Sequence, residues 1–275
     1  LFDAAKAGHT GSLDPIATGV LPICFGEATK FSQYLLDANK RYETTIKLGV
    51  KTTTGDREGE VIEERDVPKL DREVINACLE RFRGEIKQVP SMYSAIKKDG
   101  QPLYKLARQG IEVERQARDI SIYSLMLSAF DETTLNLDVH CSKGTYIRSL
   151  AEDIGEVLGC GAHVIALRRT GVGAFDIADA VDFDAVSRAS SDDAGALDGL
   201  LRPVEEAVSA MPSVTLSTLS GAYLLQGQPV QVANAPRDGL VQLFQSSGDH
   251  DQFIGIGEVL DDGRIAPRRL LAAQT

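Results

Sequence analysis

Asp14 is the only carboxylate in the segment GHTGSLDPIATGVLP (8–22), where it stands among glycines, threonines and prolines. A carboxylate in such a loop can act as a nucleophile or pair with a cation. The alternative is structural, because Asp followed by Pro commonly begins a helix or a turn. Gly8, Gly11 and Gly19 suit turns that need a positive φ or a close backbone approach. The segment alone favours a turn and leaves the catalytic interpretation open.

Tyr146 and Arg148 follow a predicted strand in TLNLDVHCSKGTYIRSLAEDIGEVLGCG (134–161). Apolar residues first alternate, as in a strand, and then recur at the period of a helix that Gly159 ends. We therefore expect Tyr146 and Arg148 in the first turn of this helix. A guanidinium there could hold a carboxylate, although it could equally form an ordinary surface ion pair.

Two further segments predict regular elements that could position these groups. KRYETTIKLGV (40–50) alternates around β-branched residues, which is typical of a strand. DREVINACLERFRG (71–84) has the apolar spacing of a helix, and its glycine suits the end of that helix. The residues expected to share one face are Tyr42, Thr44, Ile46 and Leu48 in the strand, and Val74, Cys78 and Phe82 in the helix.

The charge distribution is uneven. A net charge of −11 argues against broad, nonspecific binding of nucleic acid. Between Arg83 and Arg118, however, eight basic residues stand against four acidic ones, with Tyr93 and Tyr104 among them. We expect a long loop here, with a short helix near 101–109, and loops of that length are usually functional or disordered. A solvated surface without a partner is the alternative.

The composition changes after about residue 186. Residues 187–201 are small, polar and acidic, which predicts an insertion or a mobile helical loop. From residue 212 onward, short strand patterns predict a β-rich domain of about 60 residues. We therefore expect two domains, 1–211 and 212–275.

The sequence argues against several classes of protein. The four cysteines and four histidines are too scattered for a zinc site or a disulfide framework, so we expect reduced thiols and no metal. No apolar run approaches the roughly 18 residues of a membrane span, and the first residues lack the pattern of a signal peptide. We expect a cytoplasmic protein that does not bind membranes.

Four segments, in this order, closely resemble the bacterial TruB family of tRNA pseudouridine-55 synthases. They are GHTGSLDPIATGVLPICFGEATKFSQYLL, KRYETTIKLG, QVPSMYSAIKKDGQPLYKLARQGIEV and HCSKGTYIRSLAEDIGEVLGCGAHVIALRR. The resemblance is dense over residues 5–182. It continues more loosely into a C-terminal part that resembles a PUA-like RNA-binding domain. It implies an α+β fold in which helices flank a bent, mixed and mainly antiparallel sheet. The family's LDKPxGxTS sequence, with its strand and helix, has no counterpart in these residues.

The resemblance implies a role for six residues. Asp14 falls on the family's nucleophile, and Tyr42 on the tyrosine that stacks on the target base. Tyr146 and Arg148 fall on its second active-site tyrosine and its arginine. Leu167 falls on a leucine of the uracil pocket. His9 falls on a histidine that fills space vacated in the RNA loop. The basic segment 84–118 matches the part that closes over the T-arm of tRNA.

The implied reaction converts uridine 55 in the T-loop of tRNA to pseudouridine. The N1–C1′ bond breaks, the base turns, and it is rejoined through C5. This needs a nucleophile and a flipped base held between aromatic or apolar groups, but no redox step or group donor. The resemblance therefore implies a stand-alone monomer that needs no cofactor and no protein partner.

Three questions stay open at this stage. The chain could be a non-catalytic RNA-binding protein with the same fold. It could also belong to the guide-RNA-dependent branch, which acts within a multiprotein particle. Finally, Asp14 could attack either C6 of the uracil or C1′ of the ribose.

Overall fold

The computed structural model describes residues 1–192, 194–246, 248 and 250–272 and forms two compact units. The large-sheet unit consists of Ser12–Val20 and Asp37–Ala178, and the small-sheet unit of Leu1–Gly11, Leu21–Leu36 and Asp179–Thr275. These units do not follow the predicted boundary at residue 211, because two N-terminal segments and residues 179–211 group with the C-terminal strands. The two domains stay a prediction.

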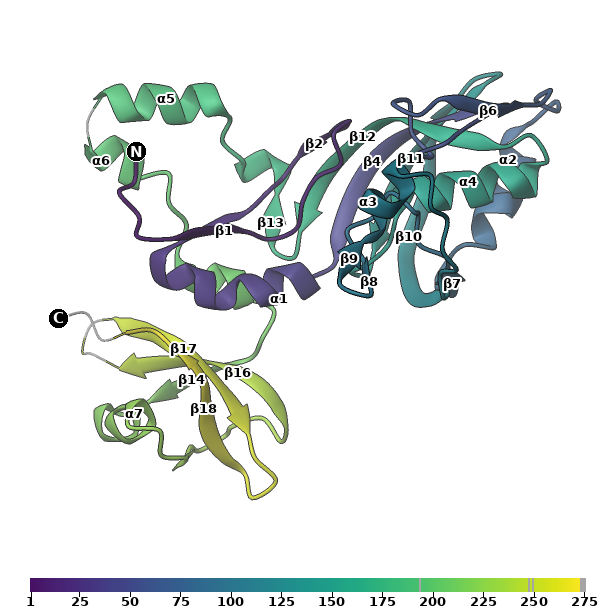
Figure 1. The fold of residues 1–275 in the computed structure, drawn as a ribbon. Coiled ribbons are helices and arrows are strands. Elements are labelled where there is room, and N and C mark those ends of the chain that lie inside the picture. Colours follow the sequence, from purple (N-terminus) through teal and green to yellow (C-terminus); the bar gives the residue numbers. More distant parts are fainter. Residues whose placement is uncertain (193, 247, 249, 273–275) are drawn as a thin grey trace. The chain divides into compact units, whose positions relative to one another are not determined.

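A seven-stranded mixed sheet forms the centre of the large-sheet unit (Figure 1). Its order is β13-β12-β4-β11-β10-β7, and β2 pairs in parallel with β12, while the other pairs are antiparallel. The strands are β2 (Ala17–Gly19), β4 (Lys40–Leu48), β7 (Gly84–Gln88), β10 (Arg118–Phe130), β11 (Thr134–Cys141), β12 (Ala162–Val172) and β13 (Phe175–Asp176). A two-stranded sheet of β5 (Val50–Thr52) and β6 (Val61–Glu64) follows β4 in the chain.

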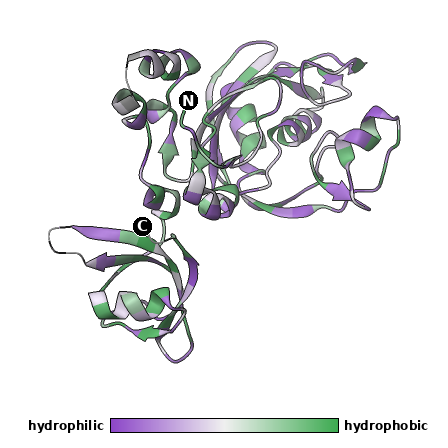
Figure 2. Cartoon of the chain, turned by 60° about the vertical axis from the view of Figure 1, so that its left-hand side comes forward, coloured by the Kyte–Doolittle hydropathy of each residue, from purple (hydrophilic) through white to green (hydrophobic). Residues whose placement is uncertain are grey.

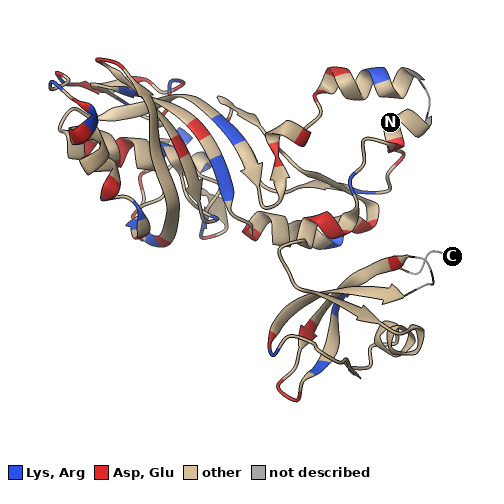
Figure 3. Ribbon diagram, turned by 180° about the vertical axis from the view of Figure 1, so that it is seen from behind, with Lys and Arg blue, Asp and Glu red and all other residues tan. Residues whose placement is uncertain are grey.

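The core of this unit lies between one face of the sheet and the helices α2 (Arg72–Glu80) and α4 (Ile147–Leu158). Every second residue of β11 is buried, as the alternation predicted. On β4, Thr44, Ile46 and Leu48 are buried, and Tyr42 packs against the same core. Lys and Arg lie beside Asp and Glu on the strands of this sheet (Figure 3). The predicted α+β fold with a mainly antiparallel sheet is confirmed.

The helix predicted for residues 71–84 is present but shorter and rotated. The side chain of Asp71 accepts a hydrogen bond from Val74 N and caps α2, which ends at Glu80. Val74 is 47% exposed, so its predicted place on the buried face is wrong. Ile75 and Leu79 lie on that face with Cys78, because they continue the i, i+4 spacing that contacts the sheet.

Helix α4 and strand β12 meet backbone to backbone. A Cβ on Gly155 would lie 2.3 Å from Ala162 N, which is closer than any side chain can come. Gly159 ends the helix at φ 86°, as predicted, and the chain then turns directly into β12. Glycine at 155 therefore allows α4 and β12 to pack this closely.

The predicted loop 84–118 is shorter than expected, because both of its ends are strands of the sheet. Gly84–Gln88 is β7 and pairs with the start of β10, since its alternating residues continue the core face. The irregular part, which we call the basic loop, is residues 89–117. It holds the short hairpin β8 (Lys97–Lys98) and β9 (Gln101–Pro102), and the helix α3 (Leu103–Arg108) that the sequence predicted.

The small-sheet unit contains a five-stranded sheet in the order β14-β16-β17-β18-β15. Its strands are β14 (Ser213–Leu216), β15 (Val230–Gln231), β16 (Gly239–Ser246), β17 (Asp251–Val259) and β18 (Arg264–Leu270), and they match the predicted strand patterns. Hydrophobic and hydrophilic residues mix along its strands (Figure 2), and a cluster around Leu216, Leu243 and Ile265 forms its core.

The N-terminal and acidic segments complete this unit. Phe31 is fully buried against Val208, Phe253 and Ile256, so the segment 21–36 packs on residues far away in the sequence. The predicted insertion 187–201 is largely helical, apart from residue 193, which lies outside the described residues. The remaining elements are β1 (Ala7–His9), β3 (Ile23–Phe25), α1 (Ser32–Asp37), α5 (Phe183–Asp192), α6 (Ala194–Asp198) and α7 (Thr218–Leu225), with 3₁₀ turns η1 (Gly26–Phe31), η2 (Ile177–Asp179) and η3 (Val204–Val208).

Candidate active site

Asp14 and Arg148, 134 residues apart in the chain, form a two-point ion pair. Arg148 Nε donates to Asp14 Oδ2 at 2.8 Å, and Arg148 Nη2 donates to Asp14 Oδ1 at 3.1 Å. The Arg148 side chain is 5% exposed, whereas the Asp14 side chain is 34% exposed. A buried guanidinium thus presents an accessible carboxylate in a fixed orientation, with its charge stabilised by hydrogen bonds.

The other N–H groups of Arg148 are also used. Nη1 donates to Thr54 O at 2.9 Å and lies 3.6 Å from Asp56 Oδ2, and Nη2 also donates to Tyr93 O at 3.0 Å. A guanidinium has five N–H groups, and each of them here has an acceptor or an anionic neighbour. Arg148 therefore has little freedom to turn away from Asp14. Through Tyr93 it also contacts the basic loop.

The turn at Asp14 leads into a strand and not into a helix. Ala17 N donates to Asp14 O at 2.8 Å, and residues 17–19 then form β2 along the edge of β12. The helix start considered for Asp-Pro is therefore wrong, because β12 takes the following residues into the sheet. Gly19 has φ 106° and lies so close to β12 that a Cβ would stand 2.1 Å from Arg169 O. The turn presents Asp14, and Gly19 permits the contact that fixes the turn.

Asp56 is a site residue that the sequence interpretation missed. Its side chain is 5% exposed, and its Oδ1 accepts hydrogen bonds from Thr54 Oγ1 at 2.6 Å and Glu58 N at 3.0 Å. Its Oδ2 faces Arg148. It lies in the segment TGDREG (54–59), which forms a polar turn between β5 and β6. A buried Asp in a polar turn gives no signal in a sequence, because turns use Asp for their own hydrogen bonds.

Tyr42 and Leu167 lie near one another across β4 and β12. Leu167 is opposite Thr44 on β4 and opposite Ala17 on β2. Leu167 is buried, and Tyr42 is partly buried against the same core. Burial raises the pKa of the Tyr42 phenol to about 12, and the negative charge of Asp14 acts in the same direction. The structure thus brings Asp14, Tyr42, Arg148 and Leu167 into one part of the large-sheet unit.

Tyr146 is the N-cap residue of α4 and not part of its first turn, because its extended backbone (φ −98°, ψ 110°) still continues the preceding segment. The side chain of Gln88 holds it there. Tyr146 N donates to Gln88 Oε1 at 2.8 Å, and Gln88 Nε2 donates to Tyr146 O at 3.0 Å. Gln88 is 2% exposed. It is the last residue of β7 and therefore joins the base of the basic loop to the helix that carries Arg148.

His9 lies in the small-sheet unit, where it ends β1 opposite Ile23 of β3. It is exposed, and its Nδ1 accepts a hydrogen bond from Gly11 N at 3.3 Å. The predicted role of His9 in RNA binding stays a prediction.

The basic loop exposes several of its cations. Lys97, Lys98, Lys105 and Arg108 are exposed, and the Arg108 guanidinium lies 5.6 Å from the centre of the Tyr104 ring. Arg115 donates to Pro90 O at 3.1 Å and lies 3.5 Å from a Glu112 oxygen, so it ties the two ends of the loop together. The loop combines exposed positive charge with aromatic rings, which is the combination that RNA-binding surfaces use.

In the part of the chain that the structure describes, no group of three or more His, Cys, Asp or Glu side chains is arranged to hold a metal ion. Within the same residues, no helix is long and apolar enough to cross a membrane. All four cysteines are buried, and burial raises the pKa of each thiol.

Family models match almost the whole chain. Residues 1–147 match the N-terminal domain of the TruB family of pseudouridylate synthases, residues 148–209 match the tRNA pseudouridylate synthase B C-terminal domain, and residues 212–271 match the C-terminal part of pseudouridine synthase II TruB. The tRNA pseudouridine synthase B of Ectopseudomonas mendocina is 58% identical over 272 residues, which cover 98% of this chain and 88% of that protein. The protein of the same name from Pseudomonas aeruginosa is 56% identical with the same coverage.

A solved structure shares the fold. The crystal structure of a Cbf5-Nop10-Gar1 complex contains a chain that superposes with a TM-score of 0.70 at 25% identity, covering 98% of this chain and 77% of that one. Together with the matches above, this agreement over nearly the full length leads to one conclusion. The chain belongs to the TruB family of pseudouridylate synthases.

Proposed function

We propose that this chain isomerises uridine 55 in the T-loop of tRNA to pseudouridine, with Asp14 as the nucleophile. The observation that carries the proposal is the pair of a buried Arg148 and a partly exposed Asp14 joined at two points. A protein that only binds RNA gains nothing from a carboxylate held toward an anionic partner. A nucleophile needs this arrangement, because the two hydrogen bonds from the guanidinium fix the direction of the carboxylate.

The remaining residues have roles that follow from their positions. The target base is buried in a folded RNA loop, so it must be flipped out before Asp14 can reach it. The ring of Tyr42 and the side chain of Leu167 offer an aromatic and an apolar surface for that base. Tyr146, which immediately precedes α4, and His9 are proposed to contact the RNA. No group donor enters the reaction, because the base that leaves C1′ through N1 returns to it through C5.

The names of the relatives support a stand-alone enzyme acting on tRNA, and we propose that it works as a monomer in the cytoplasm. Pseudouridine has the mass of uridine, so the test uses carbodiimide labelling of an unmodified tRNA transcript and mapping by primer extension. The expected result is a single labelled position, 55, formed without other proteins. A transcript with cytidine at 55 is the control. Tight binding without any pseudouridine would favour the non-catalytic interpretation.

The substrate is proposed to be recognised chiefly through its T-arm. The basic loop is one modest patch on a chain of net charge −11, which is too little to hold a whole tRNA by phosphate contacts. An isolated T-arm stem-loop should therefore be modified nearly as fast as full-length tRNA. A strict requirement for the acceptor end or the anticodon arm would contradict this.

The C-terminal residues 212–275 are proposed to add RNA affinity without taking part in the chemistry. On β18 the exposed side chains of Arg264 and Arg268 are 48% and 60% accessible, although each is paired with a carboxylate. Replacing both by Gln should raise KM with kcat unchanged, which is the signature of lost uniform binding. A fall in kcat at saturating RNA would show that this assignment is wrong.

A further inference from the structure

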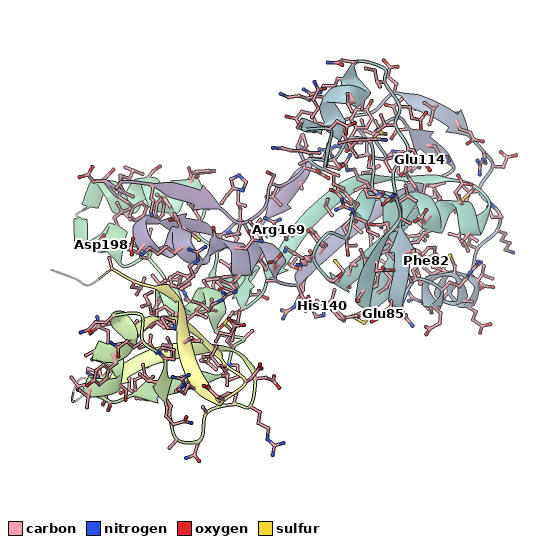
Figure 4. The ribbon with its side chains drawn as sticks, turned by 60° about the horizontal axis from the view of Figure 1, so that its bottom comes forward. Phe82, Glu85, Glu114, His140, Arg169 and Asp198 are labelled. Carbon is pink, nitrogen blue, oxygen red and sulfur yellow. The ribbon has the colours of Figure 1, made fainter. Side chains whose placement is uncertain are left out.

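Arg169 is a buried arginine for which the proposed reaction has so far given no role. It lies on β12 (labelled in Figure 4) and is 3% exposed. Its neighbour Arg168 points to the other face of the strand and is exposed. A buried guanidinium is costly unless its N–H groups find acceptors. The acceptors of Arg169 therefore indicate what it is for.

The first acceptor is at the end of the loop that carries Asp14. Arg169 Nε donates to Val20 O at 2.7 Å, and Val20 N donates to Arg169 O at 2.8 Å. The side chain of Arg169 thus donates to the backbone of Val20, and the backbone of Val20 donates to the backbone of Arg169. Gly19, directly opposite Arg169 in the parallel pair β2–β12, permits this approach. Val20 comes six residues after Asp14, so this contact fixes one end of the nucleophile's turn.

The second neighbour is the side chain of Tyr42. Tyr42 stands directly opposite Arg169 in the antiparallel pair β4–β12, so both side chains lie on one face of the sheet, and the positive charge of Arg169 acts on the Tyr42 phenol. One side chain therefore contacts both the segment that ends the nucleophile's turn and the ring proposed to stack on the base. Its planar, forked guanidinium suits two neighbours in different directions, which a lysine ammonium on a flexible stem does not.

We propose that Arg169 is a positioning residue that holds the Asp14 loop and the Tyr42 ring in a fixed relation to one another. This rests on the proposed function, because it assigns Asp14 and Tyr42 to the reacting base. Arg169 does not touch the substrate. It acts by keeping the attacking carboxylate and the stacked base at the distance the reaction needs, and small errors in such a distance are costly in rate.

The test compares Arg169→Lys with Arg168→Lys, the matched change on the adjacent, exposed position of the same strand. Single-turnover rates on a T-arm RNA, RNA affinity and thermal melting are measured on the same preparations. Arg169→Lys should lower the rate about 10- to 100-fold while RNA affinity changes less than about threefold. Arg168→Lys should keep the parent rate. A rate for Arg169→Lys within about threefold of the parent would overturn the proposal.

A second variant separates positioning from general stability. Tyr42→Phe keeps the stacking ring and removes only the hydroxyl group on which the charge of Arg169 acts. If Arg169 acts through that hydroxyl group, the two changes should not add, and the double variant should react about as fast as Arg169→Lys alone. Multiplicative losses would contradict the link to Tyr42.

Two further outcomes complete the design. If Arg169→Lys does not fold, the rate of Tyr42→Phe decides, because a parent-like rate would show that Arg169 does not act through the Tyr42 hydroxyl group. Failure of the proposed function is distinguishable from failure of this inference. In the first case the parent chain itself forms no pseudouridine in tRNA, whereas in the second the parent is active and Arg169→Lys is equally active.

Discussion

Gln88 and Tyr146 are joined by two hydrogen bonds in which a side-chain amide takes the place of a neighbouring strand. The amide oxygen accepts from Tyr146 N and the amide nitrogen donates to Tyr146 O. Gln88 ends β7, and Tyr146 precedes the helix that presents Arg148. The start of the basic loop and the start of α4 therefore share one fixed point.

Replacing Gln88 should weaken both the fold and the reaction. In Gln88→Leu the N–H of Tyr146 loses its partner and its C=O keeps only Leu150 N, which costs about 1–3 kcal/mol of the free energy of unfolding. We expect the single-turnover rate to fall about tenfold, because Tyr146 and Arg148 lose their support. Urea denaturation and rapid-quench assays measure the two effects. Glu85→Gln, an exposed change on the same strand (Glu85 is labelled in Figure 4), is the control and should alter neither.

Asp14→Asn should abolish isomerisation and leave the fold in place. The new side chain is almost isosteric, and the turn depends on the backbone oxygen of residue 14, which stays bonded to Ala17 N. The charge that Arg148 pairs with is lost, and so is the nucleophile. The rate should fall by several orders of magnitude, while RNA binding is retained or slightly tighter. A folded variant that reacts within about tenfold of the parent would exclude Asp14 as the nucleophile.

Asp56→Asn should lower the rate through Arg148. The amide oxygen can still accept from Thr54 Oγ1 and Glu58 N, so the turn 54–58 is retained. The negative charge 3.6 Å from Arg148 Nη1 is lost, and the guanidinium is then less firmly held in place for Asp14. We expect a roughly 10- to 100-fold loss in kcat with little change in KM. Glu58→Gln, at a 60% exposed carboxylate two residues away, should behave as the parent.

Lys40 should make stability depend on pH in a defined direction. Burial lowers the pKa of its ammonium group from 10.5 to about 8, and the positive charge of Arg169 adds to the effect. Between these two values the unfolded chain binds the proton and the folded chain does not, so Lys40 favours folding more as the pH rises from about 8 to 10.5. Below about pH 8 Lys40 is protonated in both the folded and the unfolded chain. Its buried charge then lowers the free energy of unfolding by an amount that does not change with pH.

The variant Lys40→Met isolates this contribution. It should exceed the parent in free energy of unfolding by the largest margin at or below about pH 7, and the margin should shrink as the pH approaches 10. Chemical denaturation of both proteins at a series of pH values measures the difference. A margin that is constant with pH, or that grows, would show that Lys40 titrates normally in the folded protein.

The sequence predicted the strand and the helix that carry the site better than the contacts between their side chains. The strand with Tyr42 and the helix with Arg148 follow from apolar periodicity, because each buries one face against the same core. Asp14 gained its interpretation from the family's motif and not from its own surroundings. Asp56 and Gln88 were missed, since their partners lie 92 and 58 residues away and only the strand register brings them together.

Arg169 did leave a signal in the sequence. Alternation along HVIALRRTG places residues 167 and 169 on one face of the strand, which is the face of the buried Leu167. A charged residue on a buried face is unusual and is normally paired with a hydrogen-bonding or oppositely charged group. One partner is the backbone carbonyl of Val20, and no sequence pattern identifies a carbonyl as a partner.

Gly155 has a consequence for how the enzyme meets its RNA. Where α4 and β12 touch, no side chain separates the two backbones, and a side chain at 155 would push the helix away from the strand. We therefore expect this contact to set the spacing between the arginine at the start of the helix and the leucine on the strand, and changes of shape during binding to occur in the nucleic acid and in the basic loop.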